Sequence, residues 1–327
     1  MKKSISRVLI VRLSALGDII NSAIVASFIK QHMQGCRVEW LCDEQFADLL
    51  RLSDSIDEVH TVALKRIKKE KKLSLIFKEI ASLRSLGAYD LIIDMQGLLK
   101  SAIVSRIIGS NIHGFDAESA REGMASHLYS TTSSIAYETN IIKRNCTLIG
   151  DGLGIEIGDE DIESKRRLFV PPKSPLLNPY VAIVVGASWA SKRYSVEGFA
   201  EVCDALAFPC LLIAGDSDEQ QMAHSIASLC SNASHYKTAS LQDLVAIITH
   251  AKLVIGGDTG PTHLAWAQNT PSITLYGPTT PRMMFETSVN LAIESSSTVD
   301  ILHIDKNDMS IIDIEPKDII EKAKQLL

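Results

Sequence analysis

The sequence predicts an α/β fold of two doubly wound, Rossmann-like domains whose parallel sheets face each other across a cleft. The chain has 327 residues, more than one hydrophobic core usually covers, and 46% of them are apolar. Short apolar runs alternate with helical patterns, and this alternation begins twice along the chain. Apolar runs without a polar face are typical of parallel strands that helices cover on both sides.

The first domain is expected over residues 1–170. Its opening run, V-L-I-V-R-L, has the length and composition of a buried strand, and residues 18–33 place apolar side chains at helical spacing. A further helical pattern lies near residues 138–150. The expected strands are 8–13, 37–42, 59–64, 90–95 and a shorter one at 111–115.

The second domain is expected over residues 180–312. The segment before it, P-P-K-S-P-L-L-N-P at 171–179, has neither a helix nor a strand period and is expected to link the domains. Residues 313–327 are typical of a helix opened by Pro316, and by analogy with related folds this helix could pack back on the first domain. The expected strands are 180–186, 210–215, 235–238, 253–258 and 272–277.

Composition excludes several classes of protein. The sequence has no run of eighteen apolar residues and no signal-peptide pattern, so a soluble, cytoplasmic protein is expected. Its six cysteines show no C-x-x-C and no metal-ligand spacing, so neither a zinc site nor a disulfide framework is expected. Neither G-x-G-x-x-G nor G-x-x-x-x-G-K-[ST] occurs, which argues against a nicotinamide dehydrogenase and a P-loop kinase.

Positive charge is concentrated in one short segment. Residues 1–170 hold 23 Lys/Arg against 22 Asp/Glu, and residues 171–327 hold 10 against 17, which gives +1 and −7. The segment K-R-I-K-K-E-K-K at 65–72 places six cations in eight positions. It is either a solvated helix face or a contact for nucleic acid, lipid head groups or a phosphorylated glycolipid. Nucleic acid is the least favoured, because no RNA-binding or helix-turn-helix pattern accompanies the segment.

Polar motifs follow the first strand of each half. In S-A-L-G-D-I-I, residues 14–20, Asp18 stands where a helix begins. Ser14 or Asp18 is either a helix N-cap or, for Asp18, a carboxylate that takes a proton from a bound hydroxyl. In G-A-S-W-A-S-K-R-Y-S, 186–195, Ser188 and Lys192 lie in the equivalent loop, where an ammonium group suits a phosphate.

Two more motifs follow later strands of the second half. In A-G-D-S-D-E-Q-Q, 214–221, the D-x-D spacing is either a divalent-metal motif or, with more weight, a helix N-cap, and Glu219 is a candidate to grip ribose hydroxyls. G-G-D-T-G-P-T-H-L-A-W-A, 256–267, joins an apolar strand to a helix, and a helix N-terminus attracts anions. The residues of this turn that offer a polar side chain or an unhindered backbone are Asp258, Thr259, Gly260, Thr262 and His263.

These motifs, in this order, resemble the lipopolysaccharide heptosyltransferases, family 9 of the glycosyltransferases. The resemblance rests on S-A-L-G-D-I-I, D-M-Q-G-L-L-K-S-A (94–102), H-G-F-D-A-E-S-A-R-E (113–122), the Lys192 loop and D-T-G-P-T-H with Y-G-P-T. It spans nearly the whole chain. Residues 94–122 are most similar to the heptosyltransferase I subfamily, which adds the first heptose to the Kdo of lipid A.

The resemblance implies a GT-B fold and an inverting, metal-independent transfer from ADP-L-glycero-D-manno-heptose, without a cofactor. It implies that Ser188 and Lys192 contact the diphosphate and that Glu219 grips the nucleotide. The family commonly has Met beside the adenine, where this chain has Ala239. The residues implied to hold the heptose and phosphates are Asp258, Thr259, Gly260 and His263.

On the acceptor side, the resemblance implies that Asp18 is the general base on the Kdo hydroxyl. Lys65, Arg66 and Lys69 match the family's basic acceptor segment, and Arg121 matches its A-R-E motif. The implied partners are Kdo-lipid A and the inner leaflet of the cytoplasmic membrane, to which the protein is expected to be peripheral, with no nucleic acid. Surface cations favour such a membrane by roughly 1 kcal/mol each.

Three other functions are compatible with these residues. A heptosyltransferase II-like enzyme would use the same donor. A GT-B nucleotide-sugar epimerase would convert free nucleotide sugar and would leave the basic segment without a role. A non-catalytic nucleotide-sugar-binding or membrane-surface protein would bind nucleotide without turnover.

Overall fold

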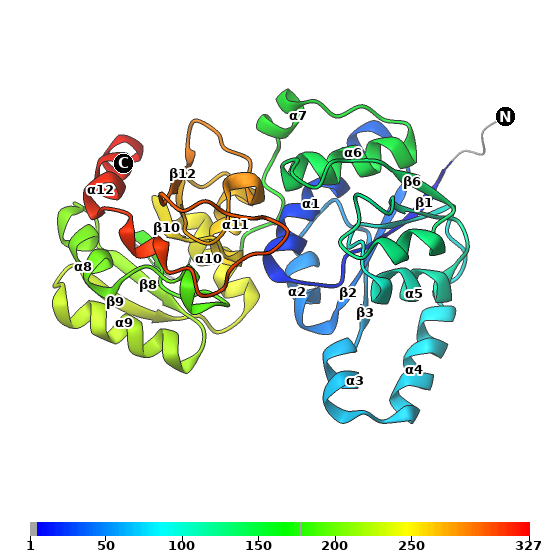
Figure 1. Cartoon of the computed structure of the whole chain (residues 1–327), viewed down its shortest axis with the longest axis horizontal. Coiled ribbons are helices and arrows are strands. Elements are labelled where there is room, and N and C mark those ends of the chain that lie inside the picture. Colours follow the sequence, from blue (N-terminus) through cyan, green and yellow to red (C-terminus); the bar gives the residue numbers. More distant parts are fainter. Residues whose placement is uncertain (1–4, 175, 177) are drawn as a thin grey trace. The chain divides into compact units, whose positions relative to one another are not determined.

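Each half of the chain folds around its own six-stranded parallel sheet (Figure 1). The computed structural model describes residues 5–174, 176 and 178–327, and the two compact units meet in sequence between Val170 and Pro171. Residues 175 and 177 of the expected linker lie outside the described residues, and the other residues of 171–179 form neither helix nor strand.

The first unit has the strand order β3-β2-β1-β4-β5-β6. Its strands are β1 (Arg7–Val11), β2 (Arg37–Asp43), β3 (Glu58–Val62), β4 (Leu91–Asp94), β5 (Ile112–Phe115) and β6 (Thr131–Ser133). Its helices are α1 (Leu16–His32), α2 (Ala47–Leu50), α3 (Leu64–Glu70), α4 (Leu73–Arg84), α5 (Leu99–Ile108), α6 (Ile141–Leu153) and α7 (Asp159–Glu163), with a 3₁₀ segment, η2, at Gly123–Leu128.

The second unit repeats this order as β9-β8-β7-β10-β11-β12. Its strands are β7 (Val181–Val184), β8 (Cys210–Ala214), β9 (Ala233–Lys237), β10 (Leu253–Gly257), β11 (Ser272–Tyr276) and β12 (Asn290–Glu294). Its helices are α8 (Val196–Ala205), α9 (Ser217–Leu229), α10 (Leu241–His250), α11 (Gly260–Ala267) and α12 (Pro316–Leu326).

In each sheet the first and fourth strands are neighbours, and the direction of winding reverses between them. Val11 of β1 pairs with Asp94 of β4, and Val184 of β7 pairs with Gly256 of β10. Ligands of doubly wound sheets bind at such a switch point, outside the carboxyl ends of the strands. We therefore expect ligand-binding residues in the loops that follow β1, β4, β7 and β10.

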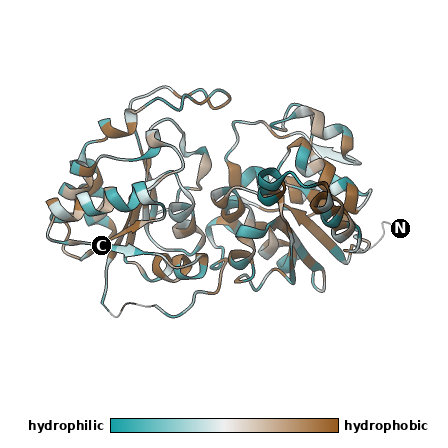
Figure 2. Ribbon diagram, turned by 90° about the horizontal axis from the view of Figure 1, so that it is seen from below, coloured by the Kyte–Doolittle hydropathy of each residue, from teal (hydrophilic) through white to brown (hydrophobic). Residues whose placement is uncertain are grey.

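Apolar strands form the centre of both cores. Residues Val8–Val11 of β1 are fully buried, as are Leu253, Val254 and Ile255 of β10. Figure 2 shows hydrophobic strands inside each unit and helices that mix hydrophobic and hydrophilic residues around them. Burial on both faces explains why these strands are continuous apolar runs in the sequence.

Two strands, β6 and β12, were absent from the expected elements. Both lie at the edge of their sheets. β6 is the three-residue segment T-T-S, and in β12 only Asn290 and Ile293 are buried. An edge strand that is only partly buried need not have the apolar run by which a strand is recognised in a sequence.

The C-terminal helix differs from its expected packing. α12 does begin at Pro316, but it packs against α8 and β11 of the second unit (Figure 1). Its buried residues Ile319 and Ala323 belong to the core of that unit. The analogy that placed this helix on the first domain overlooked that its apolar stripe completes the nearer core.

Glu39 is a charged residue of β2, between the edge strand β3 and β1, and its side chain is fully buried. Its Oε1 accepts hydrogen bonds from Arg7 Nε (2.7 Å) and Arg37 Nε (2.6 Å). Its Oε2 lies 2.6 Å from His60 Nε2 and accepts the Tyr89 hydroxyl at 2.7 Å. Burial raises the pKa of Glu39, but these hydrogen bonds, that of Arg7 first, outweigh it and hold the pKa well below its ordinary range.

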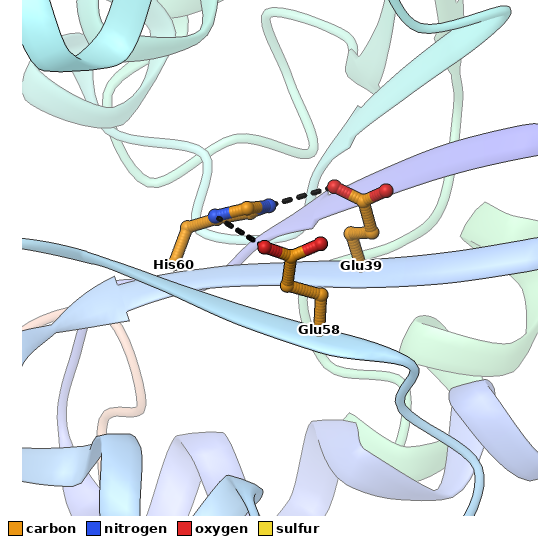
Figure 3. Close-up of side chains that lie close together, drawn as sticks. All are labelled: Glu39, Glu58 and His60. Atoms are coloured by element: carbon orange, nitrogen blue, oxygen red, sulfur yellow. Dashed lines mark hydrogen bonds and ion pairs between the residues drawn. The ribbon is translucent and has the colours of Figure 1, made fainter. Parts of the chain in front are cut away.

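Glu39, Glu58 and His60 lie close enough to share a metal ion (Figure 3). Two arginines already bind the Glu39 carboxylate, and Glu58 Oε1 is 3.9 Å from His60 Nδ1. Guanidinium groups beside a carboxylate repel a metal cation and occupy the lone pairs of the carboxylate oxygens. We therefore interpret this cluster as a structural ion-pair network.

Glu39→Gln is expected to lower the free energy of unfolding by about 3 kcal/mol at neutral pH, because it removes a fully buried carboxylate that accepts hydrogen bonds from Arg7, Arg37 and Tyr89. A carboxylate with a depressed pKa stabilises the fold above its unfolded pKa, and this stabilisation is lost as the pH falls towards the folded value. Wild-type stability should therefore decline below about pH 4 more steeply than that of the variant. Urea unfolding at several pH values measures both effects.

The matched control is Glu58→Gln, because Glu58 pairs with the same His60 from two residues away on β3 but is half-exposed. It should change the free energy of unfolding by less than about 1 kcal/mol. Equal losses in the two variants would contradict the role given to Glu39.

Candidate functional site

Asp18 lies at the start of α1, in the segment that follows β1. Its Oδ1 pairs with Arg12 Nη2 at 2.8 Å, and its Oδ2 accepts the Ala15 N–H at 3.1 Å. Ala15 is the N-cap of α1, so neither Ser14 nor Asp18 holds that position. Asp18 instead bonds back to the N-cap from the third helical residue, with 29% of its side chain exposed. The carboxylate is thus fixed in orientation and still reachable from solvent.

Arg12 and Gln96 tie the two loops of the first switch point together. The buried Arg12 guanidinium donates to the Met95 carbonyl as well as to Asp18. Gln96 Oε1 accepts the Leu13 N–H at 2.8 Å, and its Nε2 donates to the Ser14 hydroxyl at 3.3 Å. The sequence analysis gave neither Arg12 nor Gln96 a role, because the two loops are about eighty residues apart and only the β1–β4 pairing brings them together.

The candidate acceptor residues follow other strands of the same sheet. The Lys65 N–H donates to Asp43 Oδ2 (3.2 Å) at the end of β2. Arg66 lies 3.7 Å from Glu79 and 3.9 Å from Glu44. These contacts hold the start of α3 beside the carboxyl end of β2.

Arg121 and Lys69 are both exposed. Arg121 precedes η2, and the neighbouring Glu122 accepts the Leu99 N–H at 2.7 Å, beside the loop after β4. Lys69 lies in α3, which follows β3. β3 and β5 each lie two strands from β1, about 10 Å at the usual strand spacing, so Arg121 shares the carboxyl edge with Asp18, whereas Lys69 lies in the last turn of α3 and further from it; neither residue contacts Asp18 in any described interaction.

Lys192, Asp258 and His263 form a buried ionic cluster at the second switch point. Lys192 Nζ is 2.6 Å from Asp258 Oδ2 and also donates to the Asp258 carbonyl at 3.2 Å. His263 Nε2 is 2.9 Å from Asp258 Oδ1. Burial raises the pKa of Asp258, but the partners His263 and Lys192 more than offset this and hold it well below its ordinary range. Asp258 is therefore the anion around which the other two side chains are arranged.

Gly257 explains how Lys192 approaches β10 so closely. A Cβ at position 257 would lie 2.4 Å from the Lys192 carbonyl oxygen, so only glycine fits. The Lys192 ammonium also lies 4.8 Å from the centre of the Trp189 ring. Two of its three N–H groups serve Asp258, which leaves one for a bound anion.

The first turn of α11 offers fewer amide donors than its sequence suggests. Thr259 is the N-cap, and its N–H donates to the Thr262 hydroxyl at 3.1 Å. Pro261 has no N–H. The amides left for an anion in this turn are those of Gly260 and Thr262, at the positive end of the helix.

Glu219 lies over the ends of β7 and β8. Its Oε2 accepts the Gly215 N–H at 2.7 Å, and a Cβ at Gly186 would be 2.0 Å from its carboxyl carbon. Arg193 Nη2 lies 3.9 Å from Glu219 Oε1, an ion pair that the sequence analysis did not anticipate. Ser188 is exposed in the loop after β7. The carboxylate keeps lone pairs that can accept from hydroxyl groups.

Asp216 is the N-cap of α9, since its Oδ1 accepts the Glu219 N–H at 2.9 Å. This is the interpretation of D-x-D that the sequence analysis favoured over a metal motif.

Three buried hydroxyl groups of the second unit have no hydrogen-bond partner among the described residues. They are the Oγ of Ser191, the hydroxyl of Tyr276 and the Oγ1 of Thr279. Tyr276 ends β11, the neighbour of β10, and burial together with the charge of Asp258 raises its pKa well above the ordinary range. Thr279 follows in the same loop. The sequence analysis used Y-G-P-T, residues 276–279, only as part of the family resemblance, because an unpaired hydroxyl has no signature in a sequence.

The two units thus offer complementary chemistry. The first presents a fixed carboxylate that can accept a proton. The second presents an ammonium group, helix-terminal amides and hydroxyl groups, which suit a phosphate-bearing ligand without further charge. Among residues 5–174, 176 and 178–327, no helix is long and apolar enough to cross a membrane.

Comparison with solved structures defines the fold. An Escherichia coli heptosyltransferase, WaaC, solved with ADP-2-deoxy-2-fluoro heptose, is similar with a TM-score of 0.80 and 24% identity, over 98% of this chain and 100% of that one. A family 9 glycosyl transferase from Veillonella parvula is similar with a TM-score of 0.80 and 17% identity, over 100% of this chain and 98% of that one. The fold is therefore the GT-B fold of these glycosyltransferases.

Sequence comparison defines the family. Residues 77–305 match glycosyltransferase family 9 (heptosyltransferase). The chain is 33% identical to lipopolysaccharide heptosyltransferase 1 of Campylobacter coli, over 98% of both proteins. It is 29% identical to the protein of that name from Escherichia coli K12, over 85% of this chain and 90% of that protein. The chain belongs to glycosyltransferase family 9.

Proposed function

We propose that this protein transfers L-glycero-D-manno-heptose from ADP-heptose to the Kdo of Kdo-lipid A, in the synthesis of the lipopolysaccharide inner core. The observation that carries the proposal is the near-full-length relation to lipopolysaccharide heptosyltransferase 1. The Escherichia coli relative of known structure was solved with ADP and with a fluorinated ADP-heptose, which supports the same class of donor here.

The proposed reaction is a single displacement that inverts the anomeric carbon. The Kdo hydroxyl attacks that carbon, its proton passes to Asp18, and the bond to the phosphate oxygen breaks with its electron pair leaving on ADP. A general base contributes about 10²- to 10⁴-fold to such a step. The Arg12 ion pair and the Ala15 N–H hold Asp18 in one orientation for it.

The donor-side roles follow from the cluster in the second unit. Lys192 and the amides of Gly260 and Thr262 stabilise the negative charge that develops on ADP. Asp258 orients Lys192 and His263 from the interior, a role that its burial favours over direct contact with the sugar.

The remaining donor groups surround this cluster. Ser188 and Thr259 offer hydroxyl groups to the phosphates, and Glu219 accepts from the ribose. Because the Ala239 N–H is donated to Asp243 Oδ2 at 2.8 Å, a backbone contact to adenine would use the Ala239 carbonyl.

On the acceptor side, Lys65, Arg66, Lys69 and Arg121 are proposed to bind the phosphates and carboxylates of Kdo-lipid A. The position of Lys65 beside the end of β2, and of Arg121 after β5, at the same sheet edge as Asp18 supports this assignment. Because this acceptor is membrane-embedded, the protein is proposed to act peripherally at the cytoplasmic face of the inner membrane.

One incubation tests both the activity and the absence of a metal requirement. Purified protein with ADP-heptose and Kdo-lipid A should add one heptose to the lipid, measured by mass spectrometry. A chelator should leave the rate unchanged, because protein groups meet the charge of the leaving ADP. The product linkage, determined by NMR, should show inversion.

Other outcomes identify the alternatives. Transfer only to an already heptosylated core indicates a heptosyltransferase II-like enzyme, and conversion of ADP-heptose without acceptor indicates an epimerase. Nucleotide binding without turnover on any acceptor indicates a binding protein. If a chelator abolished heptose transfer and a divalent ion restored it, the metal-independent mechanism would be contradicted.

A further inference from the structure

Two large apolar side chains are exposed at the start of α4. The exposed fractions of Leu73 and Phe77 are 70% and 69%. Their four-residue spacing places them on one face of the helix. The helix is anchored elsewhere, since Leu83 is buried and α4 packs against α5. The exposed pair is therefore an additional apolar face that the first unit does not cover.

Exposed cations directly precede this apolar pair in the sequence. α3 and α4 are joined by a tight turn, in which Lys71 has a left-handed conformation with φ 52°, and Figure 1 shows both helices extending away from the sheet. Residues 65–72 carry six cations and one acid, Glu70, which gives a local charge of +5 on a chain whose net charge is −6. Lys68, Lys69, Lys71 and Lys72 are all exposed. We call residues 68–77 the α3–α4 tip.

We infer that the α3–α4 tip docks on an anionic phospholipid bilayer, with Leu73 and Phe77 entering the interface and the lysines contacting head groups. The inference rests on the proposed function, which places the acceptor in a membrane. Apolar side chains beside a basic cluster combine the two attractions that interfacial segments use. A second copy of this chain fits the tip poorly, because residues 68–77 carry four lysines and one glutamate, and pairing two tips would bring two +3 segments together.

The variant Leu73→Ser/Phe77→Ser tests the apolar part of this contact. Both residues are largely exposed, so the fold should be retained. In co-flotation with vesicles of phosphatidylethanolamine and phosphatidylglycerol, its binding should fall about ten-fold or more. Leu302→Ser is the matched control, since Leu302 is 61% exposed in an acidic loop of the second unit, and it should bind like the wild type.

A second variant measures insertion directly. In Phe77→Trp, brominated lipids should quench the introduced indole and its emission should shift to the blue on vesicles, whereas Leu302→Trp should show neither change. High salt should weaken binding through the lysines but preserve part of the apolar contact. The inference would be overturned if Leu73→Ser/Phe77→Ser bound vesicles as strongly as the wild type, or if brominated lipids did not quench Phe77→Trp. It would also be overturned by a wild-type oligomer in solution that the double substitution dissociates.

Activity measurements separate this inference from the proposed function. Leu73→Ser/Phe77→Ser should transfer heptose to a deacylated, water-soluble acceptor at the wild-type rate and to vesicle-embedded Kdo-lipid A more slowly. Equal losses on both acceptors would contradict membrane docking. If the wild type transferred no heptose but still bound vesicles through Leu73 and Phe77, the proposed function would fail and the docking surface would stand.

Discussion

Asp18→Asn is expected to reduce kcat for heptose transfer by about 10³-fold, because the amide cannot take the proton of the acceptor hydroxyl. The asparagine keeps an oxygen that can accept the Ala15 N–H, so the start of α1 should be preserved. The affinity for ADP-heptose should be unchanged, since the proposed donor groups belong to the second unit. Steady-state kinetics and calorimetric titration of the donor measure the two quantities.

Asp48→Asn is the matched control for this variant. Asp48 is also a carboxylate of the first unit paired with an arginine, Arg51, at 2.8 Å, but it is exposed and lies outside the loops of the first switch point. It should transfer heptose at the wild-type rate. If Asp18 served only to cap α1, Asp18→Asn would keep most of its activity, and that result would refute the general-base assignment.

Lys192→Met is expected to lower kcat/KM by about 10²- to 10³-fold, the usual effect of removing one preorganised group that stabilises developing charge. The ammonium is held at 2.6 Å from the buried Asp258, so it needs no reorganisation when ADP leaves. The substitution also leaves Asp258 with His263 as its remaining ionic partner, which should lower the melting temperature. Transfer kinetics and thermal unfolding separate the two effects.

Lys306→Met is the control, because Lys306 Nζ also lies 4.8 Å from the Trp189 ring but the residue is exposed. The substitution leaves Trp189 in place and removes a cation that forms no part of the Asp258 cluster. Its activity should equal that of the wild type. A Lys192→Met enzyme within ten-fold of the wild type at saturating donor would show that the leaving group is stabilised elsewhere.

Most strands of both sheets were predictable from the sequence, and the exceptions have a physical cause. Central parallel strands such as β1 and β10 are buried on both faces, so they must be apolar runs. The edge strands β6 and β12 are under no such constraint, and tertiary pairing alone makes them strands. The buried charge of Glu39 was equally hidden, since three of its four partners, Arg7, His60 and Tyr89, come from other parts of the first unit.

The candidate site divides in the same way. Its motifs stand at strand ends in the sequence, which was enough to single out Asp18, Lys192, Glu219 and the turn at Asp258. Contacts between motifs were not predictable, because they join residues brought together only by adjacent strands. Asp258 provides the example: the sequence analysis assigned it to the ligand, whereas the structure shows it buried between Lys192 and His263.

The sequence by itself therefore determined two α/β units, most of their alternating strands and the strand-end loops that hold the candidate site residues, because burial and helix starts impose local patterns on the chain. Tertiary structure alone decided that Arg12 orients Asp18, that Asp258 organises its cluster, and that Leu73 and Phe77 remain uncovered. Each of these depends on which distant segments the sheet order makes neighbours, and on which surfaces that order leaves exposed.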